Sequence, residues 1–65
     1  MWVEFMTVRN AYVAETWREL FAAEGLSMLV VPPVGRGEQA SMRDPRTLYV
    51  PTGKAHVARE ILRKI

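Results

Sequence analysis

The chain has 65 residues, no cysteine, one histidine and a net charge of +2. A chain of this length forms one domain and buries only about 60% of its unfolded surface, so it gains from an added source of stability. The missing cysteines exclude disulfides and thiolate metal sites, and one histidine cannot form a histidine cluster. We therefore expect no metal and no cofactor, and we predict a homodimer.

Hydrophobic residues make up 49% of the chain and charged residues 25%, which is typical of a globular rather than a disordered protein. No apolar run approaches the roughly 20 residues of a membrane span. The first residues also lack the basic start and long apolar core of a signal peptide. These features predict a cytoplasmic, bacterial-type protein without a membrane partner.

Residues 2–8 predict a first strand, because they are rich in β-branched and aromatic side chains. Strand alternation places four side chains on one face: Trp2, Glu4, Met6 and Val8. The opposite face carries Val3, Phe5 and Thr7. Both faces are largely apolar, so neither is expected to be fully solvated.

A helix is predicted from Ala11 to Glu24, with Asn10 as its N-cap. Its apolar stripe follows helical spacing through Val13, Trp17, Leu20 and Phe21. Gly25 follows, where a helix stop requires a residue at positive φ.

The continuous apolar run at residues 26–31 predicts a second, buried strand that Pro32 and Pro33 end. A loop is expected over residues 34–46, and a short third strand over residues 47–50. Thr52 is the predicted cap of a second helix over residues 53–64, whose stripe contains Ala58, Ile61, Leu62 and Ile65.

The predicted order is β-α-β-β-α over a single domain, residues 1–65. A β-α-β crossover is expected to make the first two strands parallel neighbours, with the third strand beside one of them. Two helices on one face of a three-stranded sheet form an α+β, truncated ferredoxin-like sandwich. The other face then has no cover, and Trp2, Met6 and Val8 are its predicted interface residues.

Several short segments resemble a family of small bacterial domains described as prokaryotic signal-transducing proteins. The resemblance is carried by Ala14-Glu15, Leu20, Ala23-Glu24-Gly25-Leu26, Tyr49-Val50-Pro51 and Ala58-Arg59-Glu60-Ile61-Leu62. It spans nearly the whole chain and implies a ferredoxin-like β-α-β-β-α unit with a role in signalling. Members often have acidic residues after the Val-Pro pair, where this chain has Thr52-Gly53-Lys54.

Thr52, Gly53 and Lys54 open a helix, where free N–H groups, a hydroxyl and an ammonium group suit a small anionic ligand. The alternative is a threonine N-cap followed by a tolerated glycine. The upstream glycine of a phosphate-binding loop is missing.

Charge is unevenly distributed along the chain. Residues 1–33 contain two cationic and four anionic side chains, so their net charge is −2. Residues 34–65 contain seven cationic and three anionic side chains, so their net charge is +4. Arg36, Arg43 and Arg46 in the glycine-containing loop form a candidate nucleic-acid contact, or simply a solvated loop. His56 has no catalytic partner at a recognisable spacing. The sequence favours a non-enzymatic regulatory or ligand-sensing domain that self-associates, with a nucleic-acid-binding module as the alternative.

Overall fold

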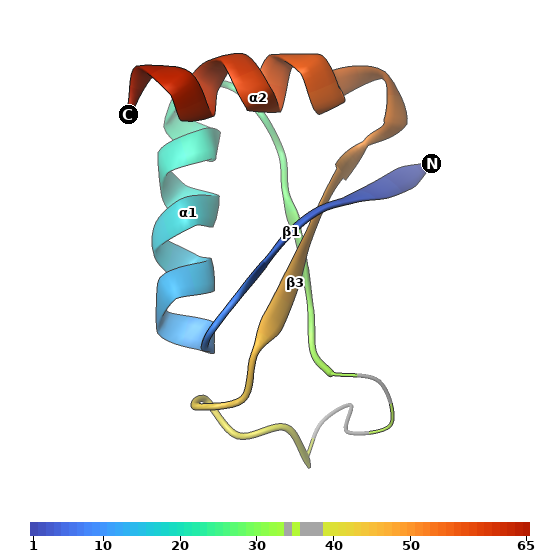
Figure 1. The fold of residues 1–65 in the computed structure, drawn as a ribbon, viewed down its shortest axis with the longest axis vertical. Helices are drawn as coiled ribbons and strands as arrows, with labels where there is room; N and C mark the ends of the chain where they lie inside the picture. Colours follow the sequence, from blue (N-terminus) through green and yellow to red (C-terminus); the bar gives the residue numbers. More distant parts are fainter. Residues whose placement is uncertain (34, 36–38) are drawn as a thin grey trace.

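The computed structural model describes residues 1–33, 35 and 39–65. Along the chain it contains β1 (Trp2–Val8), α1 (Ala11–Ala23), β2 (Leu29–Val31), β3 (Arg46–Pro51), the 3-10 turn η2 (Thr52–Lys54) and α2 (Ala55–Lys64). The described part of the chain is therefore of the α+β class, with one antiparallel three-stranded sheet and two α-helices. In Figure 1, α1 stands along one side of the strands and α2 crosses the top of the molecule, with its C-terminal end near the end of α1.

The central strand of the sheet is β3. The strand order is β1-β3-β2, and β3 runs antiparallel to both neighbours. Strands β1 and β2 are thus parallel to each other but are separated by β3, so the expectation that they are neighbours is wrong. The crossover through α1 leaves space for one strand, and β3 fills that space because it can pair with an open edge on each side.

A β-bulge in β1 changes which of its side chains face the helices. Glu4 is opposite Tyr49 and Met6 is opposite Leu48, which leaves Phe5 without a partner on β3. Directly opposed residues point to the same face, so Met6 lies on the same face as the fully buried Leu48.

Val8, opposite the buried Arg46, lies on that helix-covered face too. Both Met6 and Val8 pack against the core. Their predicted place on the uncovered face is wrong, because the extra residue at the bulge reverses the alternation of the strand. Trp2, before the bulge, keeps its predicted place and is 45% exposed.

The core joins one face of β3 to both helices. Its buried apolar residues are Ala14, Phe21, Leu26, Met28, Leu48, Val50, Ala58 and Ile61. Since Leu48 and Val50 are two residues apart on β3, α1 and α2 cover the same sheet face. Leu20, expected in this core, is 39% exposed.

The start of α1 is capped by Asn10, as predicted. The Asn10 side chain accepts a hydrogen bond from the N–H of Val13 at 2.9 Å. At the other end Gly25 has the predicted positive φ, 86°. The N–H of Gly25 donates to the carbonyl of Ala22 and that of Leu26 to the carbonyl of Phe21, both at 2.9 Å. This is the Schellman pattern, in which a glycine in the left-handed region ends a helix.

The second strand is shorter than predicted. Its ladder with β3 spans only residues 29–31, although a strand over 26–31 was expected. Leu26 and Met28 are buried but lie before the strand. Leu26 uses its N–H to close the cap of α1, so it is not free to begin a ladder.

Candidate functional site

The predicted anion site at Thr52, Gly53 and Lys54 has a different local role. The backbone N–H and the hydroxyl of Thr52 both donate to the carbonyl of Met1, at 2.9 and 3.1 Å. The prediction that Thr52 caps the second helix is therefore wrong. Thr52 instead joins the start of the chain to the end of β3. Two donors that an anion would use are already engaged. Gly53 has no positive φ, so its backbone does not require glycine.

The three predicted loop arginines do not act as a set. Arg46 is only 8% exposed, and its guanidinium donates to the carbonyls of Ser41, Asp44 and Pro45 at 3.0, 2.9 and 3.2 Å. Its side chain holds the loop and does not point into solvent. The prediction that Arg46 belongs to an exposed basic surface is therefore wrong. Arg43 is exposed. Arg36 lies outside the described residues.

The carbonyls that Arg46 binds belong to a compact turn, residues 41–45, which we call the Arg46-held turn. Ser41 and Asp44 are linked twice within it: the N–H of Asp44 donates to the Ser41 carbonyl, and the N–H of Ser41 to the Asp44 carboxylate, both at 3.0 Å. The N–H of Ala11 donates to the carbonyl of Met42 at 2.9 Å, which joins the turn to the start of α1. In the sequence, the only indication of this turn is that Ser41 and Asp44 are three residues apart, a spacing that allows such paired hydrogen bonds.

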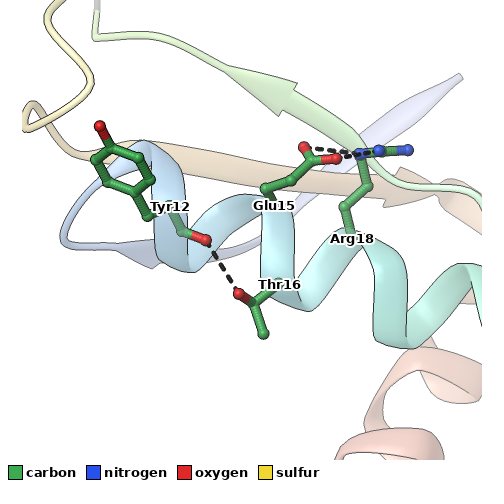
Figure 2. A network of polar contacts seen from close by, with 4 residues as sticks. All are labelled: Tyr12, Glu15, Thr16 and Arg18. Atoms are coloured by element: carbon green, nitrogen blue, oxygen red, sulfur yellow. Dashed lines mark hydrogen bonds and ion pairs between the residues drawn. The ribbon is translucent and has the colours of Figure 1, made fainter.

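Two separate polar contacts lie along α1 (Figure 2). Glu15 and Arg18 form an ion pair, with the Arg18 Nε–H donating to the Glu15 carboxylate at 3.0 Å. This hydrogen bond lowers the pKa of Glu15 and raises the pKa of Arg18. The Thr16 hydroxyl donates to the carbonyl of Tyr12 at 3.1 Å. Tyr12 itself is 63% exposed.

The sheet face turned away from the helices is the second exposed feature. Its side chains follow the register in three rows: Trp2 and Pro51; Glu4, Tyr49 and Leu29; Thr7, Thr47 and Val31. We call these eight residues the open face. Trp2 and Leu29 are 45% and 41% exposed, and the Thr7 and Thr47 hydroxyls are 3.4 Å apart. Glu4 is the one charged member, so this face is mainly apolar.

The part of the chain that the structure describes contains no pocket and no group of three side chains placed to bind a metal ion. None of its helices has the length and apolar character needed to cross a bilayer. His56 lies exposed at the second position of α2. Comparisons of the chain with protein-family models, curated proteins and solved structures give no match.

Proposed function

We propose that this protein is a non-enzymatic regulatory domain that acts as a homodimer, with the open faces of two copies packed together. The open face is the observation that carries this proposal. It presents Trp2 and Leu29 to solvent beside the half-buried Tyr49, Val31 and Pro51. Contiguous exposed apolar surface of this kind is characteristic of protein–protein interfaces.

The shape of the molecule supports the same proposal. The chain extends 32 × 23 × 15 Å, so it is thin in one direction. Its accessible surface is 4632 Å², compared with ~4,200 Å² for a typical monomer of this mass. Packing a second sheet against the open face would complete a second core layer, as in other sheet-on-sheet structures. Glu4 lies on the edge strand β1, where its carboxylate can remain hydrated at the rim.

The strand order supports a finer assignment of the fold. The helix α1 connects β1 to β2 while β3 lies between them, which makes a split β-α-β unit. We take the fold to be a truncated ferredoxin-like sandwich on this ground. A small anionic ligand at residues 52–54 would have to use donors other than those of Thr52, and Lys54 would supply its cationic contact.

Sedimentation equilibrium over micromolar to millimolar protein concentrations tests the dimer. The wild type is expected to be dimeric, and a Trp2→Lys, Leu29→Lys variant monomeric, because two ammonium groups would have to be buried in the interface. Leu62→Lys is the matched control, since Leu62 is 37% exposed but lies on α2. A wild-type protein that stays monomeric at millimolar concentration contradicts the proposal.

A further inference from the structure

The Arg46-held turn and the start of α1 together present four exposed side chains: Arg9, Tyr12, Met42 and Arg43. The hydrogen bond from Ala11 to Met42 brings these two segments together. In Figure 2 the Tyr12 ring projects from the first turn of α1 on the side of this turn, and Figure 1 places the same two segments together. We propose that this surface, the Tyr12–Arg43 surface, binds single-stranded nucleic acid.

The surface is held in shape before any ligand arrives. The buried Arg46 side chain fixes the turn through three hydrogen bonds to its carbonyls. Within the turn, the Arg43 N–H donates to the Ser41 hydroxyl at 3.1 Å. The Asn10 cap fixes the first turn of α1, which carries Tyr12. A contact surface that is already ordered loses less conformational entropy on binding.

The charge around Tyr12 is positive. Arg9 and Arg43 are both exposed, and neither forms an ion pair with any residue that the structure describes. Two carboxylates lie in the same segments: Glu15 pairs with Arg18, and Asp44 belongs to the turn that the Arg46 guanidinium holds. With Arg9 and Arg43 these groups make four arginines and two carboxylates, so an incoming phosphate meets a net positive charge.

The combination of an exposed ring with two arginines favours single-stranded nucleic acid over an acidic protein. A base has a flat apolar face that can stack on Tyr12, while arginines contact the phosphates on either side. Met42 is 51% exposed and adds apolar area beside the ring. A duplex has its bases stacked internally, so the ring selects an unpaired strand. This surface shares no residue with the open face, so it can be tested separately from the dimer.

Fluorescence anisotropy with a labelled dodecamer of uridylate at low salt tests the proposal. Tyr12→Ala removes one stacked base and is expected to weaken binding about 5- to 150-fold, whereas Tyr12→Phe should bind like the wild type. Arg9→Gln with Arg43→Gln should reduce the slope of log affinity against log salt by about 1.4, since each phosphate contact to a single strand contributes roughly 0.7. Arg59→Gln with Arg63→Gln removes the same charge from two exposed positions of α2 and is the matched control.

Circular dichroism and a thermal melt establish that each variant is folded. The proposal is supported if the first arginine pair and Tyr12→Ala lose affinity while the control pair retains it. If the Arg9 and Arg43 pair and the control pair lose the same affinity, the effect is one of net charge and the proposal is overturned. No binding of the dodecamer by the wild type also overturns it. So does equally tight binding of an oligo-aspartate peptide that is insensitive to Tyr12→Ala, which would indicate an acidic protein partner.

Discussion

Phe21 is the side chain whose removal should matter most to stability. It is fully buried, and its ring centroid lies 5.9 Å from that of Phe5 and 6.0 Å from that of Trp17. Phe-to-Ala changes in cores cost about 3–5 kcal/mol, and the loss of two aromatic contacts places this one in the upper part of that range. A chain of this length has a total stability of about 3–10 kcal/mol, at roughly 0.05–0.15 kcal/mol per residue. Phe21→Ala should therefore leave much of the protein unfolded.

Urea denaturation followed by circular dichroism measures this change. Phe21→Leu is the control, because it keeps most of the apolar volume and should cost roughly 1–2 kcal/mol. Trp17→Ala provides the comparison: Trp17 is only half-buried, so its loss should cost about 2 kcal/mol. If Trp17→Ala proves as damaging as Phe21→Ala, or if Phe21→Ala melts like the wild type, the core described for this protein is wrong.

Four further predictions concern backbone conformation and polar contacts. Gly25→Ala should cost about 1–2 kcal/mol because Gly25 has φ of 86°, and a normal melting temperature would contradict that helix stop. Gly53→Ala should raise stability by about 0.4–1 kcal/mol, since no atom lies within 4 Å of an added Cβ; a loss would show that the backbone there needs glycine. Arg46→Lys cannot reproduce the fork of hydrogen bonds to three carbonyls, so it should cost about 1–3 kcal/mol and speed amide exchange in the Arg46-held turn. If amide exchange in the turn is unchanged in this variant, Arg46 does not hold the turn. In an NMR titration the pKa of Glu15 should lie below its ordinary value and return to it in Arg18→Gln. The stabilisation from this pair is present above the unfolded pKa and lost as pH falls through the lower, folded pKa.

Several features of the fold could be predicted because they depend on neighbours in the sequence. The bounds of β1 were confirmed at residues 2–8, and Asn10 and Gly25 occupy the predicted positions at the two ends of α1. An N-cap and a Schellman motif form within about six residues, so the residue types that favour them are informative by themselves. The apolar stripe of α1 was confirmed at Phe21 but not at Leu20.

The errors arose where a residue's partner is distant in the chain. Met6 and Val8 were placed on the wrong face because a bulge appears only when β1 pairs with a strand some 40 residues away. Thr52 suggested a helix cap, but its donors meet the carbonyl of Met1, 51 positions earlier. The loop arginines looked alike in the sequence, and only burial separated Arg46 from Arg43.

The sequence by itself determined the α+β class, the bounds of β1, the start and end of α1 and the end of β2 before Pro32, since these follow from local conformational preference and hydrophobic period. The tertiary structure decided that β3 is central, that Trp2 but not Met6 or Val8 belongs to the open face, and that Arg46 supports a surface carried by Tyr12 and Arg43. These outcomes depend on strand pairing and burial between distant segments, and a side chain's chemistry does not specify whether its partner will be solvent or another part of the chain.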